Sequence, residues 1–355
     1  MSNLHAYTGV LTNDSIWYSA MELNSLYRFD LEKHTNEFVC LFSGEKSFQK
    51  EIHKICVTVG NFMVFLPFRG RHIHIYNSNV SSMVSILFEE YVYDAFTLEG
   101  DVWMVCGENG EKLYILNILD KEISCVEEYE NAYKSVGKQG GRRFKYYNGH
   151  IWFGCLGTNK IADWDIQEKE LSIHSTDIKN IFAICPTNTA CWVIDRDTPN
   201  IYEWNYRDET VVHNIDDLYI SADAKELPYS PRFYNNIFCF KDRIVLLPAF
   251  TDYVSIYDGK EIKKQRIEVP ERAKNLPKCF GYVSSNKGVY LIPFCTDKLI
   301  CISETLDIRI DSSFPNMPNS LSWKEKHTVM EESIKEKGYV DESELLGLKD
   351  FLSVI

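Results

Sequence analysis

The sequence lacks any long hydrophobic run, and it is poor in positive charge. Its apolar runs, such as residues 63–66 and 181–185, are far shorter than the roughly 20 residues that span a bilayer. The first residues also lack the basic and apolar regions of a secretory signal, so we expect a cytoplasmic protein without a membrane segment. Only 38 Lys and Arg stand against 51 Asp and Glu, which gives a net charge of −13. That balance argues against binding to nucleic acids or membrane surfaces.

Several motifs that carry chemistry are also missing. There is no Walker A motif, no GxGxxG and no GxSxG, so P-loop, dinucleotide-binding and α/β-hydrolase chemistry have no support. The 11 cysteines form no CxxC pair and lie in apolar surroundings, which favours reduced, buried thiols. His72 and His74 share one face of a strand and could bind a metal. No third ligand is evident, so we favour a packed or exposed pair, and we expect neither a metal nor a cofactor.

An internal repeat is the strongest feature that is present. A short apolar strand recurs every 40 to 53 residues, and a small polar residue follows it at a nearly constant distance of 13 or 14 residues. The strand is marked by Trp17, Met63, Trp103, Trp152, Trp192, Val245 and Tyr290. The polar residues are Asp30, Asn77, Asn117, Asp165, Asn205, Asp258 and Ser303. A fixed offset within a variable period is what a rigid hairpin joined by adjustable loops produces.

Each unit also has an apolar strand before the marker and another after the polar residue, which makes four short strands. Residues such as Gly60, Asn148 and Gly149 suit the tight turn before the marker strand. Each Asx residue suits the turn between the third and fourth strands. The sequence therefore predicts an all-β fold, a seven-bladed β-propeller of four-stranded antiparallel blades over residues 1–313. A tandem of β-sandwiches is the alternative, and the absence of helical periodicity excludes an α-solenoid.

Residues 314–355 form a separate tail in which the repeat stops. A segment with two prolines leads into a roughly helical pattern around Trp323 and Ile334, followed by Gly338. We expect a short, partly helical tail that packs on the propeller edge and covers a sheet edge. An exposed arm that binds a partner is the other interpretation.

A few sequence segments are similar to those of known propellers. They are residues 149–165, and the steps Leu66-Pro67, Leu247-Pro248 and Ile292-Pro293. On these the chain resembles the bacterial propellers of the kelch, WD-like and streptogramin-lyase types. The resemblance implies the fold and no single activity, because that group includes lyases, hydrolases and scaffolds. Streptogramin lyases use a histidine and a glutamate with a divalent ion near the axis, and that pair maps onto no residues of this chain.

One face of the predicted propeller gathers candidate ligand-binding residues. The connections between blades, and those between the second and third strands of each blade, meet on this face, and the long insertions at 129–143, 215–236 and 268–278 belong to it. Arg and Lys there would focus an anion in an acidic protein, and Arg would bind carboxylate or phosphate in bidentate fashion. The alternative is that these charges pair locally. The candidates are His53, Arg71, Arg142, Arg143, Arg196, Arg232, Tyr234 and Asn235.

These observations predict a binding or scaffold propeller that presents the loop face to a protein partner or a small anionic ligand. The glycines ahead of Arg142 fit either an anion-binding nest or a flexible linker. The alternative function is a propeller lyase or hydrolase, with or without a metal, whose polar site at the axial mouth includes His53, Arg143 and Tyr234. The sequence leaves the oligomeric state open.

Overall fold

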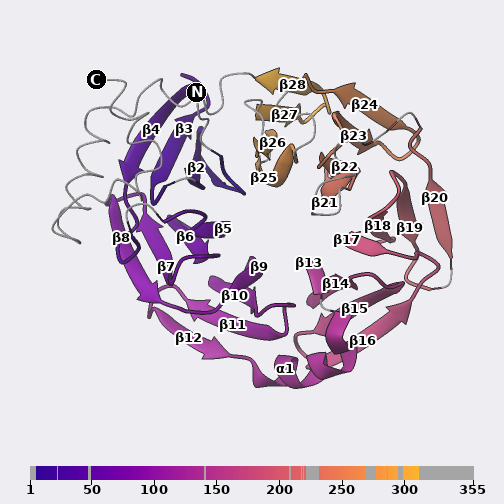
Figure 1. The fold of residues 1–355 in the computed structure, drawn as a ribbon, viewed down its shortest axis with the longest axis horizontal. Helices are drawn as coiled ribbons and strands as arrows, with labels where there is room; N and C mark the ends of the chain where they lie inside the picture. Colours follow the sequence, from indigo (N-terminus) through magenta and orange to yellow (C-terminus); the bar gives the residue numbers. More distant parts are fainter. Residues whose placement is uncertain are drawn as a thin grey trace.

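The computed structural model describes residues 5–21, 23–46, 49–139, 141–207, 209–216, 218, 220, 232–268, 277–285, 287–294 and 299–311. Within these ranges the strands form seven antiparallel sheets of four strands each, arranged as blades around a central axis (Figure 1). This confirms the predicted seven-bladed β-propeller. The boundary at residue 313 and the tail at 314–355 lie outside the described residues and stay predictions.

We number the blades 1 to 7 in chain order, and each takes its four strands consecutively from the chain. The innermost strands are β1 (Val10–Thr12), β5 (His53–Val59), β9 (Val92–Leu98), β13 (Gly141–Tyr147), β17 (Ile181–Pro186), β21 (Tyr234–Phe240) and β25 (Cys279–Ser285). The second strands are β2 (Ser15–Ser19), β6 (Phe62–Pro67), β10 (Asp101–Cys106), β14 (His150–Cys155), β18 (Cys191–Asp195), β22 (Arg243–Pro248) and β26 (Gly288–Pro293). The third strands are β3 (Leu26–Asp30), β7 (His72–Asn77), β11 (Lys112–Asn117), β15 (Lys160–Asp165), β19 (Ile201–Trp204), β23 (Tyr253–Tyr257) and β27 (Leu299–Ser303). The outermost strands are β4 (Thr35–Cys40), β8 (Ser82–Leu87), β12 (Glu122–Cys125), β16 (Glu170–Ser175), β20 (Thr210–His213), β24 (Ile262–Arg266) and β28 (Ile308–Asp311).

The turn residues play the roles that the repeat predicts. Asn148 and Gly149 both have positive φ, 50° and 84°, in the turn between β13 and β14. The Asx side chains accept hydrogen bonds from the backbone two residues on: Asn117 Oδ1 accepts from Leu119 at 3.0 Å and from Asp120 at 2.9 Å. The other five Asx residues do the same, and Ser303 accepts from Asp307. The third strand of each blade therefore ends in a turn that its own last side chain closes.

The hydrophobic core lies between neighbouring blades. One buried cluster joins blades 1 and 2 and includes Phe42 and Phe65, and another joins blades 7 and 1 and includes Ile292 and Tyr18. No strand is shared between the first and last blades in the described part of the chain, so side-chain packing closes the ring. The contact is tight at Gly281 of β25, where a Cβ atom would lie 2.6 Å from the Tyr7 carbonyl oxygen.

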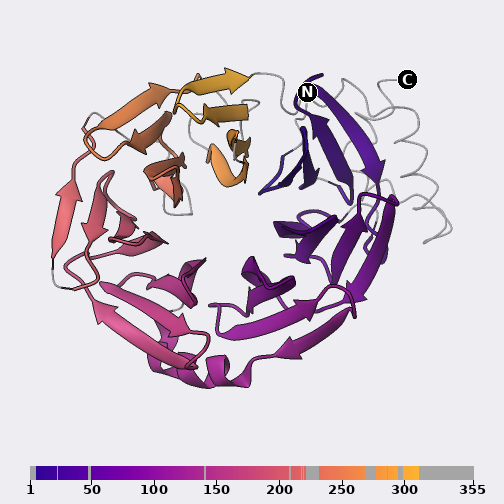
Figure 2. The same ribbon diagram turned by 180° about the vertical axis from the view of Figure 1, so that it is seen from behind.

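A short helix follows blade 3 at the outer rim of the ring. Helix α1 (Glu127–Tyr133) leads into a 3₁₀ helix, η1 (Lys134–Gln139), and α1 contacts β11 and β16. Tyr129 is fully buried, and its hydroxyl donates to the Gly110 carbonyl at 3.0 Å. The start of the long insertion predicted at 129–143 therefore covers the seam between blades 3 and 4 at the rim, as both views of the ring show (Figures 1 and 2).

The described cysteines form no disulfide bonds, as predicted. The prediction that they are buried is wrong for Cys125 and Cys239, which are exposed because one lies on outermost strand β12 and the other lies next to the end of β21. Burial raises the pKa of most of the described cysteines, including Cys155, whose pKa rises to about 11. Among the helices that the structure describes, none is long and apolar enough to cross a membrane.

Candidate functional site: a cationic cavity on the propeller axis

Six of the seven innermost strands carry a β-bulge at the same place, close to where the strand begins. In β5, for example, His53 pairs with Pro67 and Ile55 pairs with Leu66, which leaves Lys54 as an extra residue. The equivalent shifts occur in β9, β13, β17, β21 and β25. A bulge re-aims the side chain of the extra residue away from the regular pleat.

These bulged residues surround a cavity of about 210 Å³ on the axis. Its lining comes from six blades, through the innermost strands and the loops beside them, and consists of Lys54, Tyr93, Asp94, Arg143, Leu156, Phe182, Arg196, Arg232 and Phe280. Lys54, Tyr93, Phe182 and Phe280 are the extra residues of β5, β9, β17 and β25, and Arg143 lies within the bulge of β13. The bulges therefore build the wall of the cavity.

Positive charge dominates this lining. Four cationic side chains face the cavity and Asp94 supplies the single carboxylate, in a protein whose net charge is −13. Three of the cations are arginines, whose planar guanidinium groups match carboxylate and phosphate oxygens. Such a lining concentrates positive potential at the axis of a protein whose overall charge is negative.

Burial perturbs the two charged groups at the bulges of β9 and β13. It raises the pKa of the Asp94 carboxyl, and the charges of Lys145, Arg143 and Lys54 act against that rise. Burial also lowers the pKa of Arg143, and the nearby Asp94 carboxylate opposes that change. The folded protein therefore holds charge at the axis at a desolvation cost, which is a common property of binding and catalytic sites.

Aromatic rings flank the cations. The Lys54 ammonium lies 5.0 Å from the ring centre of Phe68 and 5.6 Å from that of Tyr93, and its Nζ donates to the Tyr91 hydroxyl at 3.3 Å. The Arg232 guanidinium lies 4.7 Å from the ring centre of Phe182. A ring face attracts a cation without cancelling its charge, so these contacts orient the cations and leave the cavity electropositive.

Arg143 also has an unusual backbone. Its φ is 53°, in the left-handed region, and Arg143 is the only non-glycine residue at the six bulges with positive φ. Glycine would adopt this conformation without the steric cost that a Cβ atom brings. Strain of this kind is often retained where a side chain is needed for function.

The structure brings together three of the residues proposed from the sequence, namely Arg143, Arg196 and Arg232. Arg142 belongs to β13, but its side chain lies outside the described part of the chain. Arg71 lies at the surface and pairs with Glu89. This is the local pairing that the sequence analysis kept as the alternative.

Tyr234 and Asn235 point into the protein instead of the cavity. Tyr234 is 2% exposed in the cluster between blades 5 and 6, and its hydroxyl lies 3.4 Å from Ser255 Oγ. Asn235 is the bulged residue of β21, and its side-chain amide donates to the Cys279 carbonyl of β25. Both residues therefore join strands and do not line the cavity.

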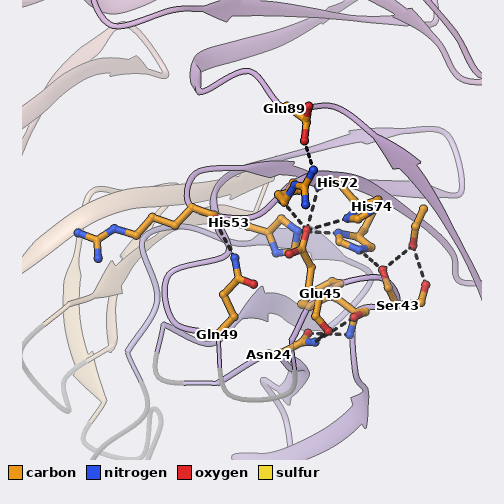
Figure 3. Close-up of polar contacts among 12 residues, drawn as sticks. Asn24, Ser43, Glu45, Gln49, His53, His72, His74 and Glu89 are labelled. Atoms are coloured by element: carbon orange, nitrogen blue, oxygen red, sulfur yellow. Dashed lines mark hydrogen bonds and ion pairs between the residues drawn. The ribbon is translucent and has the colours of Figure 1, made fainter. Parts of the chain in front are cut away.

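His53 lies in a buried chain of hydrogen bonds between blades 1 and 2 (Figure 3). Its Nδ1 lies 2.9 Å from Ser19 Oγ, its Nε2 lies 2.8 Å from His74 Nδ1, and His74 Nε2 lies 2.9 Å from the Ser43 carbonyl oxygen. A carbonyl only accepts, so His74 Nε2 carries a proton, and neutral His74 accepts from His53 Nε2. His53 Nδ1 then accepts from the Ser19 hydroxyl, which fixes every proton in the chain.

The neighbouring histidine has a different partner. His72 Nδ1 lies 3.0 Å from Glu45 Oε1, and the same carboxylate oxygen accepts from the backbone amides of Arg71 and His72. His72 and His74 are thus engaged in separate contacts, as a packed pair (Figure 3). Within the described residues no group of three His, Cys, Asp or Glu side chains could hold a metal ion.

The candidates from the sequence do not include Phe182 and Phe280, because they were chosen for polar or charged side chains. Alignment of the repeats could have found them: the bulged residues all lie nine or ten positions before the marker residue of their own blade. Lys54, Tyr93 and Arg143 hold that place in blades 2, 3 and 4, and Phe182 and Phe280 hold it in blades 5 and 7.

Two larger cavities, of about 640 and 710 Å³, lie at the turns that join the first and second strands. The first lies between blades 1 and 2, and its lining contains three carboxylates and one cation, Arg28. The second is lined by several aromatic side chains, with Lys145 and Asp242 as its charged groups. Neither concentrates positive charge as the axial cavity does.

Comparison with known proteins adds evidence on the fold. No family model matches the sequence, and no curated protein matches it. Among solved structures, a streptogramin B lyase has a TM-score of 0.61 at 12% identity, over 88% of this chain and 95% of that one. A catalytically inactive virginiamycin B lyase from Staphylococcus aureus, solved with quinupristin, has a TM-score of 0.60 at 12% identity, over 83% and 93%. The WD40 repeats of RRP9 have a TM-score of 0.58 at 9% identity, over 85% and 88%.

These similarities define the class of protein and go no further. The chain has the β-propeller fold that a streptogramin B lyase and the WD40 repeats of RRP9 also have, as the sequence predicted. One fold hosts many functions, so the function has to be argued from the site.

Proposed function

We propose that this protein is a binding propeller that takes a small anion into the axial cavity. The observation that supports the proposal is the cavity itself, in which Lys54, Arg143, Arg196 and Arg232 surround about 210 Å³ and face a single carboxylate. These four cations converge on one space from four different blades. An anion would offset their mutual repulsion and their desolvation.

The size of the cavity limits the ligand. Sites for drug-sized molecules usually enclose about 300 to 1,000 Å³, so a cavity of about 210 Å³ suits a smaller compound. A carboxylate or a phosphate monoester fits the arginines, which can bind either group with two parallel hydrogen bonds.

A thermal-shift screen with small carboxylates and phosphate esters tests the proposal. A ligand at 100 times its Kd adds about 2.7 kcal/mol to the stability of the folded state, which corresponds to a rise of a few degrees in Tm for a protein of this size. The double variant Arg196→Gln/Arg232→Gln should lose the shift. Arg71→Gln is the matched control, because that arginine lies outside the cavity, and it should keep the shift. The absence of any shift across the screen would contradict the proposal and favour a protein partner.

Catalysis is the second candidate, and Asp94 is the observation that favours it. Asp94 is the only carboxylate in the lining, and burial raises its pKa toward the range in which a carboxyl can exchange protons with a ligand. If the protein is an enzyme, Asp94→Asn should still bind the anion but should no longer consume it, as measured by NMR of the ligand. Equal ligand consumption by both proteins would exclude this role for Asp94.

A further inference from the structure

The axial cavity combines two kinds of side chain, and this combination indicates the class of ligand. Cationic side chains come from blades 2, 4, 5 and 6, as Lys54, Arg143, Arg196 and Arg232, and aromatic side chains come from blades 3, 5 and 7, as Tyr93, Phe182 and Phe280. Figure 1 shows the innermost strands of these blades, β5 to β25, arranged around the axis.

The bulges place most of these side chains in the lining. In blades 2, 3, 5 and 7 one lining residue is the extra residue of the innermost strand, and in blade 4 Arg143 belongs to the bulge. Blade 6 differs, because its bulged Asn235 bonds to β25, and Arg232 from the preceding segment lines the cavity in its place. A bulge changes the direction of one side chain without changing the rest of the blade. The bulged positions can therefore carry different residue types with little effect on the fold.

Two kinds of surface meet around one small space, and a ligand that uses both needs two properties. The cations require negative charge, and the faces or edges of the rings favour a flat, conjugated group that packs in offset or edge-to-face geometry. We propose that the axial cavity selects an aromatic carboxylate, and that the bulged residues Phe182 and Phe280 determine this selectivity. The inference rests on the proposed function, since it specifies which anion the cavity takes.

The volume is consistent with a single ring. About 210 Å³ lies below the usual range for drug-sized ligands, so one aromatic ring with its carboxylate suits the space better than a nucleotide does. Phe182 is 9% exposed, as expected for a ring that packs against its blade and presents one side to the cavity. The Arg232 guanidinium lies over this ring, 4.7 Å from its centre, so a ligand ring that meets the edge of Phe182 can place its carboxylate at Arg232.

Two probes of equal charge test whether the cavity prefers a flat ring. Benzoate and cyclohexanecarboxylate both carry one carboxylate on a six-membered ring, but only the benzoate ring is flat. An aromatic pair contributes about 0.5 to 1.5 kcal/mol beyond its buried area, and 1.4 kcal/mol is tenfold in affinity. With two phenylalanines in the wall, we expect benzoate to bind about tenfold more tightly in titration calorimetry.

Variants at the bulges test which residues carry the preference. Phe182→Leu and Phe280→Leu should lower the affinity ratio of the two probes toward one and should leave the affinity for cyclohexanecarboxylate within about twofold. Phe238→Leu is the control, because Phe238 lies on innermost strand β21 at a regular position, outside the cavity lining. This variant should keep the ratio.

The outcomes separate the two proposals. If both probes bind wild-type protein equally, the selectivity is refuted while anion binding stands. If neither probe binds, and no other small anion does, the proposed function fails and the inference fails with it. If a leucine variant does not fold, the ratio measured on the wild-type protein still decides the selectivity.

Discussion

Replacing Arg143 with glycine is expected to stabilise the ligand-free protein while it weakens anion binding. Arg143 holds φ at 53° in the bulge of β13, and burial of its guanidinium disfavours the charged form. Both features cost stability, and glycine removes both. Proteins often lose stability at the groups that their ligands need.

The backbone alone sets the size of the expected gain. A left-handed conformation costs a residue with a Cβ atom about 1 to 2 kcal/mol, while glycine adds about 0.4 to 1 kcal/mol of entropy loss on folding. The net gain is therefore about 0.5 to 1 kcal/mol, and relief of the desolvated charge adds to it. Lys121 is the matched control, because it has φ of 61° in an exposed turn outside the cavity.

Urea unfolding of the three proteins, with and without the best anion from the screen, measures both effects. Arg143→Gly and Lys121→Gly should both unfold at higher urea concentration than the wild type, and only Arg143→Gly should lose the stabilisation that the anion gives. A loss of more than 1 kcal/mol in ligand-free Arg143→Gly would refute the reasoning, because Arg143 would then support the fold and not the ligand.

Three further predictions concern the fold. Burial lowers the pKa of His74 to about 4 and also lowers the pKa of His53, while an unfolded histidine binds its proton near pH 6.5. Stability should therefore be full above pH 6.5 and should fall as the pH drops toward 4, by about 3 kcal/mol from His74 alone. Acid melts of His74→Gln should lack this part of the loss and keep the part from His53. Asn117→Ala removes two hydrogen bonds from the turn after β11 and should cost about 1 kcal/mol in urea melts, and no change would contradict the structural role of the Asx residues. Gly281→Ala forces a Cβ atom against the Tyr7 carbonyl and should cost about 1 to 3 kcal/mol, whereas a neutral result in the same melts would show that the ring does not close tightly there.

The fold could be predicted because its signals are local. The marker strand and the Asx turn lie within one hairpin, so their spacing stays fixed while the loops between blades vary. Asp258 illustrates this, since its carboxylate accepts from the backbone of Lys260 and Glu261, and these bonds and Lys263 lower its pKa to about 2. Such contacts involve only a few consecutive residues, so their pattern is visible in the sequence.

The site was predicted only in part, because the axial cavity depends on contacts between blades. Arg143 and Arg196 stand 53 residues apart, and only the packing of blade 4 against blade 5 brings them together at the cavity. His53 and Lys54 are neighbours in sequence, yet the bulge at Lys54 sends the two side chains to different places, one into the chain with His74 and the other to the cavity. The sequence pattern of a bulge is one inserted residue, which variable loops between blades easily hide.

Anomalous diffraction from crystals grown with para-iodobenzoate tests the central claim most directly, because the iodine atom reports the position of a small aromatic anion without interpretation of weak density. We expect a strong iodine peak on the propeller axis, with the carboxylate toward the arginines of blades 4 to 6 and the ring beside Phe182 or Phe280. Iodine found only in the outer cavities or at the surface, with the axial cavity empty at saturating concentration, would contradict the proposal that this cavity binds a small aromatic anion.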